Sequence, residues 1–133
     1  MRRISGLELL EVVPLQESHL VGQDPEYIYP EYFGNAAAFM YGGKFMGFLV
    51  TSEHELGLIV NAYLSNFASE KPMFILRTAN VVLDQLQGDG YDTILAPGEP
   101  ISRRWLEILG FRHDPGTSEQ LNTETHVRCR NSH

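Results

Sequence analysis

The fold is decided by the stretch that begins Leu56-Gly-Leu-Ile-Val-Asn-Ala-Tyr-Leu64 and ends Arg103-Arg-Trp-Leu-Glu-Ile-Leu-Gly-Phe111. It predicts a strand over 56–64, a helix over 72–87, a short strand over 92–96 and a second helix over 101–109. A strand, a crossover helix and a strand in this order favour a parallel pair with a right-handed connection. The stretch therefore predicts an α/β architecture.

The helix over 72–87 has the clearest periodicity in the chain. Its apolar residues recur at helical spacing, at Ile75, Leu76, Ala79, Val82, Leu83 and Leu86. Pro72 suits the first helical turn, and Ser69 is a candidate N-cap. Gly88 and Gly90 are expected to end the helix, because glycine adopts the left-handed conformation without a Cβ clash.

The second helix is also well delimited. Pro100 is expected to open it, and Gly110 is expected to end it with Phe111 folded back onto the last turn. One face is predicted to be apolar, formed by Ile101, Trp105, Ile108 and Leu109.

Outside this stretch, the sequence predicts a strand over 7–13 and a hairpin whose arms are 36–41 and 44–51. Gly42-Gly43 is a two-residue turn that requires positive φ, and Gly47 indicates a bulge or a close backbone approach. Glu53-His54-Glu55 is expected to be a polar turn. A half-exposed strand is predicted over 123–129, preceded by a loop over 115–122 and paired with 111–114.

The segment from Pro14 to Phe33 is the hardest to interpret. One short helix is expected at Leu15 to Leu20, and Asp24-Pro25 has the residues of a second helix start. The segment also holds an aromatic cluster, Tyr27, Tyr29, Tyr32 and Phe33. This cluster is either an aromatic lid on the sheet or the wall of a ligand or partner surface.

Length and charge limit the possible functions. With 133 residues and a net charge of −7, a single domain over 1–133 is expected, and neither general nucleic-acid binding nor binding to anionic membranes is favoured. Glu8 and Glu11 interrupt the N-terminal apolar residues, so a secretory signal is not expected. The one cysteine, Cys129, excludes an intrachain disulfide, and we expect it on the inner face of the last strand.

The predicted order of elements at this length resembles the GNAT (GCN5-related N-acetyltransferase) fold, with the Leu-Gly-Phe ending at 109–111 as the most specific local likeness. The resemblance implies one mixed central sheet of about six or seven strands, flanked by three or four helices. Within that fold the chain looks most like bacteriophage GNAT-like proteins of podoviruses that are associated with assembly of the internal core of the virion. This likeness is carried by residues 74–83, 91–96 and 103–111.

The chain departs from the acetyltransferase pattern at two places. Family members have a Gln/Arg-x-x-Gly-x-Gly/Ala loop that holds the pyrophosphate, whereas the same junction here is Ser65-Asn-Phe-Ala-Ser-Glu-Lys-Pro-Met-Phe74, without glycine. Pro72 removes a donor, and Glu70 adds negative charge where a phosphate would bind. In the last helix, Leu106 stands where many relatives have the tyrosine that protonates the departing thiolate, and Trp105 cannot replace it.

No other pattern indicates a strong catalytic or metal site. The five histidines, His19, His54, His113, His126 and His133, are not paired at metal-ligand spacing, so no metal site is expected. Glu55, beside His54, is either a weak candidate for a catalytic base or part of a solvated turn.

Two hypotheses follow from the resemblance. The first is a non-catalytic GNAT-like protein that binds a virion or host protein, in the host cytoplasm or in the virion, without a cofactor and with homo-oligomers conceivable. The second is an active N-acetyltransferase that binds acetyl-CoA. In that case the backbone at Asn61, Ala62 and Tyr63 would hold the pantetheine arm, Ser69 and Lys71 would meet the phosphates, and a water or Glu55 would be the base. A weaker third alternative is another small ligand in the same cleft.

Overall fold

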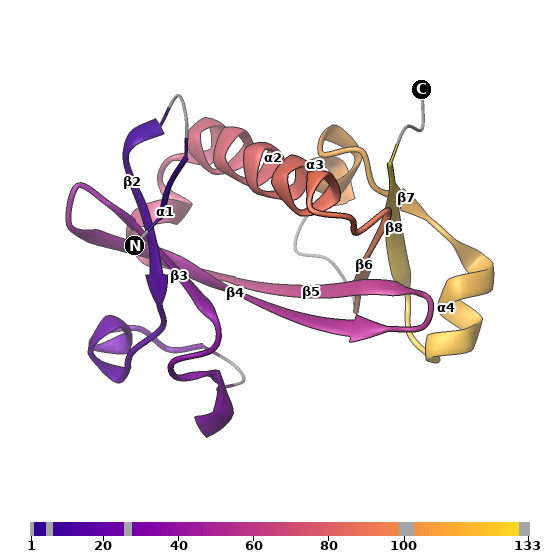
Figure 1. The fold of residues 1–133 in the computed structure, drawn as a ribbon, viewed down its shortest axis with the longest axis horizontal. Coiled ribbons are helices and arrows are strands. Elements are labelled where there is room, and N and C mark those ends of the chain that lie inside the picture. Colours follow the sequence, from indigo (N-terminus) through magenta and orange to yellow (C-terminus); the bar gives the residue numbers. More distant parts are fainter. Residues whose placement is uncertain (1, 5–6, 26–27, 99–102, 131–133) are drawn as a thin grey trace. The chain divides into compact units, whose positions relative to one another are not determined.

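The computed structural model describes residues 2–4, 7–25, 28–98 and 103–130. The chain forms two compact units, residues 1–50 with 62–75 and residues 51–61 with 76–133. Two strands and the long helix contribute residues to both units. Within the described residues the eight strands belong to one mixed sheet, slightly more than the six or seven expected. Figure 1 shows the course of the chain through these elements.

The first unit is an antiparallel array of sequential strands. Its strands are β1 (Arg2–Ile4), β2 (Leu7–Pro14), β3 (Ala37–Tyr41), the first part of β4 (Lys44–His54) and the last residues of β5 (Gly57–Leu64). The predicted strand over 7–13 and the predicted hairpin are confirmed. Strand β1 was not predicted, because three residues are too short for a recognisable period.

Glycines shape the β3–β4 hairpin as the sequence predicts. Gly42 and Gly43 have φ of 56° and 83°, the positive values that a tight two-residue turn requires. The β3–β4 register shifts opposite Gly47, and a Cβ at this position would collide with the carbonyl oxygen of Tyr63. Gly47 therefore marks both a bulge and a close backbone approach.

A core of small and aromatic side chains fills the first unit. Its buried residues are Leu15, Ala36, Ala38 and Phe48. Tyr32 and Phe33 pack against this core, as the lid interpretation requires, whereas Tyr29 is 47% exposed. Tyr27 lies outside the described residues. The aromatic cluster is thus divided between core and surface.

The segment before β3 contains two 3-10 helices, η1 (Glu17–Leu20) and η2 (Pro30–Tyr32). The short helix expected near Leu15 to Leu20 is confirmed as η1. The helix start expected at Asp24-Pro25 is wrong for the described residues, since 23–25 have no regular structure. Pro30 follows soon after, and proline cannot occupy a helix interior without losing a hydrogen bond.

The second unit contains the predicted parallel pair. Strand β5 (Gly57–Leu64) pairs in parallel with β6 (Thr93–Pro97) through Leu58↔Ile94 and Ile59↔Leu95. Strand β8 (Thr125–Cys129) pairs antiparallel with β6 on one side and with β7 (Arg112–His113) on the other, which confirms the C-terminal hairpin. The polar turn expected at 53–55 is shifted, because β4 continues to His54 and the turn is formed by Glu55 and Leu56.

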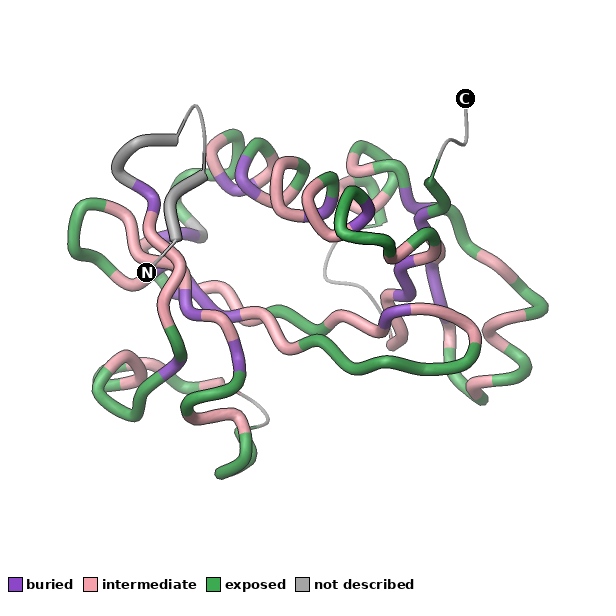
Figure 2. The backbone as a smooth tube through the Cα atoms, in the orientation of Figure 1, coloured by how far each residue is buried: buried purple, intermediate pink, exposed green. Residues whose placement is uncertain are grey.

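Helix α2 (Pro72–Gly88) agrees closely with its prediction, and Figure 2 shows buried positions recurring along it. Ser69 is not its N-cap, because this residue is the last of a one-turn helix, α1 (Asn66–Ser69). Helix α3 (Arg103–Ile108) lies where expected, although Pro100 and Ile101 fall outside the described residues. Leu109 packs inward as predicted, whereas Ile108 is exposed rather than buried and Leu106 packs inward in its place.

The end of α3 packs against the core of the second unit. The Phe111 amide donates to the carbonyl of Leu106 and the Gly110 amide to that of Glu107, the two bonds of a Schellman motif. Gly110 has the predicted positive φ of 89°. Phe111 is buried with Leu83 and Ile94.

Two expectations for the C-terminal region are wrong. Residues 115–121 form helix α4 (Pro115–Leu121) rather than a loop, with Asp114 as N-cap accepting from the Gly116 amide. Cys129 is exposed, whereas His126 and Arg128 on the expected wet face are buried. The face of β8 that carries Arg128 is covered by α2 and by the end of α3, whose groups accept from its guanidinium.

Arg128 is buried inside a hydrogen-bond network. Its guanidinium donates to the side chains of Asn80, Asp84 and Gln87, which share one face of α2, and to the carbonyl of Leu109. The Gln87 amide in turn donates to the carbonyls of Asp92 and Arg128. This network connects α2, β8 and the end of α3 within the second unit. None of the helices, over the described residues, has the length and apolarity to cross a membrane.

Candidate functional site

The β5–α2 junction is where a GNAT acetyltransferase would bind pyrophosphate, and here it is a closed helical turn. The Ser65 hydroxyl caps α1 by accepting from the Ala68 amide at 3.1 Å. The amides of Ser65, Glu70 and Lys71 donate to the carbonyls of Met46, Phe67 and Ala68, at 2.8, 3.4 and 2.9 Å. These donors are therefore already used, and they cannot also hold a phosphate.

The side chains of the junction differ from a phosphate site as well. Pro72 is the first residue of α2 and carries no N–H. Glu70 is exposed two residues before Pro72, where its charge opposes an anion. The Lys71 ammonium lies 5.6 Å from the ring centroid of Phe67, within the distance of a cation–π contact.

The residues predicted to hold pantetheine lie along β5. Asn61 and Ala62 are exposed, as backbone available to a ligand requires. Tyr63 is half-buried, with its ring stacked on Phe48 and its hydroxyl donating to Gln23 at 2.9 Å. The Tyr63 side chain thus has a structural role in the first unit, and its backbone carbonyl faces Gly47.

Glu55, the weak candidate base, lies in the β4–β5 turn beside a hollow of about 290 Å³. Glu53, Tyr91 and Asp92 also line this hollow. The Tyr91 hydroxyl donates to Glu53 at 3.3 Å, and the Glu53 carboxylate raises the pKa of Tyr91. His54 accepts from the Leu56 amide and so closes the turn. The geometry is that of a solvated turn, and no contact prepares Glu55 as a base.

Helix α3 lacks a proton donor at the expected position. Leu106, which stands in the place of the tyrosine, packs against the core formed by Leu83, Ile94 and Phe111. An aliphatic side chain can neither give nor take a proton. General acid catalysis from this position is therefore excluded.

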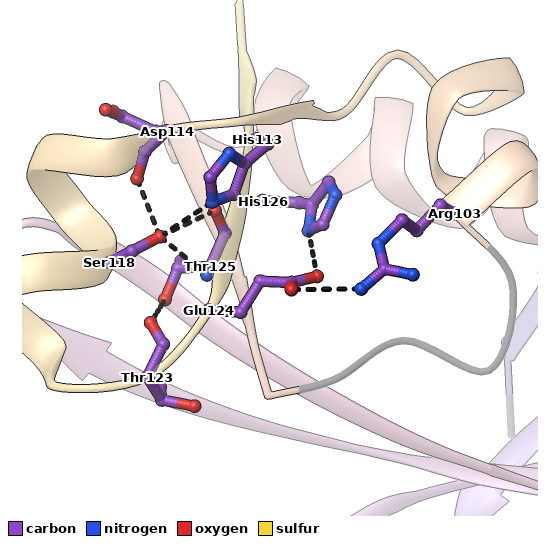
Figure 3. A network of polar contacts seen from close by, with 8 residues as sticks. All are labelled: Arg103, His113, Asp114, Ser118, Thr123, Glu124, Thr125 and His126. Carbon is purple, nitrogen blue, oxygen red and sulfur yellow. Dashed lines mark hydrogen bonds and ion pairs between the residues drawn. The ribbon is translucent and has the colours of Figure 1, made fainter.

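A polar cluster that the sequence did not indicate lies in the second unit. Figure 3 shows the Glu124 carboxylate between Arg103 and His126. One oxygen is 3.1 Å from the Arg103 guanidinium, and the other is 3.9 Å from Nδ1 of His126. Arg103 holds the pKa of Glu124 below its usual value, mainly by hydrogen bonding. Burial lowers the pKa of His126, against the opposing effect of Glu124.

The His126 side of this cluster is poorly satisfied. His126 is only 4% exposed, and among the residues that the structure describes neither its Nδ1 nor the nearer Glu124 oxygen has a hydrogen-bond partner. The rings of His126 and His113 are 5.5 Å apart. Among the described residues, no group of three or more His, Cys, Asp or Glu is placed to hold a metal ion.

The neighbouring Ser118 is not an activated nucleophile, although its hydroxyl lies 3.4 Å from Nε2 of His113. It donates to the carbonyl of Asp114 at 2.7 Å and accepts from the Thr125 amide at 2.8 Å. Figure 3 shows Ser118 joining α4 to β8 through these contacts. Its function is to anchor a helix.

Several solved structures resemble this chain in fold. An acetyltransferase from Agrobacterium tumefaciens str. C58 has a TM-score of 0.67 and 15% identity, with 98% of this chain and 96% of that protein covered. Ard1 from Thermoplasma volcanium has a TM-score of 0.62 and 10% identity over 92% of this chain and 98% of its own.

N-acetylglutamate synthase from Neisseria gonorrhoeae, in complex with coenzyme A and N-acetyl-glutamate, has a TM-score of 0.66 and 12% identity over 90% of this chain. The chain spans only about a third of that enzyme, 35% of its length. No protein-family model matches the chain, and no curated protein matches it in sequence. The chain has the GNAT fold, as predicted, and these identities support no more than the fold.

Proposed function

We propose that this chain is a degenerate GNAT-fold protein that does not catalyse acyl transfer and acts through protein contacts. The observation that carries the proposal is the closed β5–α2 junction, in which the amides of Ser65, Ala68, Glu70 and Lys71 are bonded within the protein. Coenzyme A needs free backbone donors at this point for its pyrophosphate. Leu106 in place of an acid supports the same conclusion independently.

The protein contacts, in this proposal, serve virion assembly in a bacteriophage. Support for this role comes from the likeness of residues 74–83, 91–96 and 103–111 to podovirus internal-core proteins. The protein would work in the host cytoplasm, and it would bind a virion or host protein.

The aromatic segment before β3 is our candidate for the contact surface. Val21 is 80% exposed, and Ile28 and Tyr29, seven and eight residues later, are 37% and 47% exposed. Contiguous exposed apolar side chains are typical of partner surfaces. Tyr32 and Phe33 are excluded from the surface, since they pack on the core of the first unit.

Calorimetric titration with acetyl-CoA tests the absence of catalysis. We expect no binding to the wild type, and therefore no difference between Lys71→Ala and its control, Arg77→Ala, an exposed cation on α2. Binding in the low micromolar range that is lost only in Lys71→Ala would overturn the proposal.

Affinity purification from phage lysate, followed by detection in purified virions, tests the assembly role. We expect a virion protein to be retained by the wild type and by Glu17→Gln, and lost in Val21→Asp/Tyr29→Ala. A protein that retains no virion component, and that is absent from particles and assembly intermediates, would contradict the role in assembly.

The second candidate function is an acetyl-CoA-dependent N-acetyltransferase with an atypical loop. The exposure of Asn61 and Ala62 on β5 favours it, because open backbone there suits the pantetheine arm. Ser69 and Lys71 would then meet the phosphates, and a water or Glu55 would act as base. The calorimetric titration distinguishes this candidate from the first.

A further inference from the structure

The chain contains only two lysines, and both lie over one aromatic ring. The ammonium groups of Lys44 and Lys71 are 5.0 and 5.6 Å from the ring centroid of Phe67. Lys44 follows the β3–β4 turn, and Phe67 and Lys71 belong to the β5–α2 junction. All three lie in the first unit. We call Lys44, Phe67 and Lys71 the lysine surface.

This surface is a local excess of positive charge on an acidic protein. Both lysines are exposed, and within the part of the chain that the structure describes neither has an ion-pair partner. The two ammonium groups also repel each other, because their distances of 5.0 and 5.6 Å to the same ring centroid limit their separation to about 10.6 Å. A group of negative charge from outside would relieve this repulsion.

Carboxylates on a protein suit the lysine surface better than a small anion does. The backbone amides of Glu70 and Lys71 are bonded within the α1 turn, so these two donors are not available to a free anion beside the lysines. Phe67 and the neighbouring Met73, which is 76% exposed, add apolar area beside the charges. Aromatic and methionine side chains next to cations are typical of protein interfaces.

The chain itself carries a segment of complementary chemistry at the end of the β4–β5 hairpin. Residues 51–55 are all exposed, and they include Glu53 and Glu55 next to the half-buried Leu56. We propose that a second copy of the chain docks this hairpin end, residues 53–56, onto the lysine surface. Two carboxylates then face two ammonium groups, and Leu56 lies against Phe67 and Met73.

The two docking partners are different patches, so the contact is heterologous. Each copy keeps one free hairpin end and one free lysine surface, and association therefore proceeds beyond a dimer unless a ring closes. The charges are exposed, so we expect weak binding that salt suppresses. This self-association does not depend on the proposed function.

Sedimentation velocity over a concentration series, at about 50 mM and about 500 mM salt, tests the contact. We expect wild-type association at low salt. Lys44→Glu/Lys71→Glu and Glu53→Lys/Glu55→Lys should each weaken it by about tenfold or more, and an equimolar mixture of the two should restore it. Matched controls with the same change in net charge are Arg77→Glu/Arg104→Glu and Glu17→Lys/Glu119→Lys, which should associate like the wild type.

Restored association in the mixture would establish the contact, because net charge alone cannot make two repelling variants bind each other. A wild type that stays monomeric at low salt would overturn the proposal. So would association that is unchanged by both charge reversals. If only Lys44→Glu/Lys71→Glu lost self-association, another acidic group would occupy the lysine surface. That result would also overturn the assignment of residues 53–56 as its partner.

Discussion

Arg128 and His126 lie two residues apart on β8, and both are buried, yet their polar atoms are satisfied very differently. The Arg128 guanidinium donates to three side chains of α2 and to a backbone carbonyl. Nδ1 of His126 has no hydrogen-bond partner in the described part of the chain, and the Glu124 carboxylate oxygen is 3.9 Å away. The first site is a complete network, and the second is an incomplete one.

The comparison shows that burial of an ionisable side chain has opposite consequences with and without hydrogen-bond partners. A buried charge with its hydrogen bonds complete holds neighbouring elements in one arrangement, although a well-packed apolar replacement can be as stable. Burial of an imidazole without a partner instead favours its neutral form, which explains the lowered pKa of His126. Neither residue is placed like a catalytic group that faces a substrate, so we assign a structural role to both.

Removing the Arg128 network should have the largest effect on stability. Arg128→Met leaves the Gln87 side-chain oxygen and the Leu109 carbonyl without their donor. Each buried group left unpaired costs about 1–3 kcal/mol, so we expect a loss of about 3–5 kcal/mol in the free energy of unfolding, measured by urea denaturation. Arg130→Met is the matched control, because its pair with Asp92 is solvent-exposed. An equally small change in both variants would contradict a structural role for the network.

The sequence predicts the central part of the fold because there the local signals and the packing agree. Helix α2, the parallel pair and the Gly110-Phe111 ending follow from periodicity and glycine chemistry alone. Asp24-Pro25 and Asp114-Pro115 show where such signals fail. The same dipeptide opens a helix only at Asp114, where Thr117 bonds the cap and Ser118 anchors α4 to Thr125. The Thr117 contact is local to the first turn of α4, whereas the contact of Ser118 with Thr125 forms only when α4 packs against β8.

The candidate site was less predictable than the fold. Alternation placed His126 and Arg128 on the wet face of β8, because the helix that covers the Arg128 side cannot be recognised from the residues of the strand. The partners of Arg128 on that helix are Asn80, Asp84 and Gln87, which are spaced by helical turns on α2. The junction was predicted to have too few free amides for a pyrophosphate, with Ser69 as the cap of the long helix. The extra turn α1, which Ser65 caps and Ser69 ends, was not predicted.

A narrower change tests whether the Arg128 site acts as a network. Gln87→Met keeps the volume but removes the acceptor for Arg128 and the donor to the Asp92 and Arg128 carbonyls. We expect a loss of about 1–3 kcal/mol in urea denaturation, because buried groups lose their partners. Gln85→Met, on the same helix and partly exposed, should change stability little. In a double-mutant cycle with Arg128→Met, additive losses would argue against coupling.

The His126 site should be detectable in the pH dependence of the free energy of unfolding. Its pKa is lowered in the folded protein, so the unfolded chain binds the proton first as the pH falls below the ordinary value of 6.5. Stability should therefore decrease between pH 7.5 and 5.5, and His126→Gln should flatten this decrease. Urea denaturation across this range measures the slope, and exposed His54→Gln should keep it. A slope that survives His126→Gln would assign the effect to another group.

The smallest effect should come from the one carboxylate of the Arg128 network. Asp84 is 62% exposed even though its oxygen lies 2.7 Å from the guanidinium, so water and salt screen the attraction. Asp84→Asn keeps an acceptor in place, and we expect a loss below about 1 kcal/mol that shrinks further as salt is added. Asn80→Ala removes a neutral acceptor of the same guanidinium and provides the comparison, since its effect should not respond to salt. If Asp84→Asn instead equalled Arg128→Met, the single ion pair would stabilise the site, and the contrast with His126 would rest on charge pairing alone.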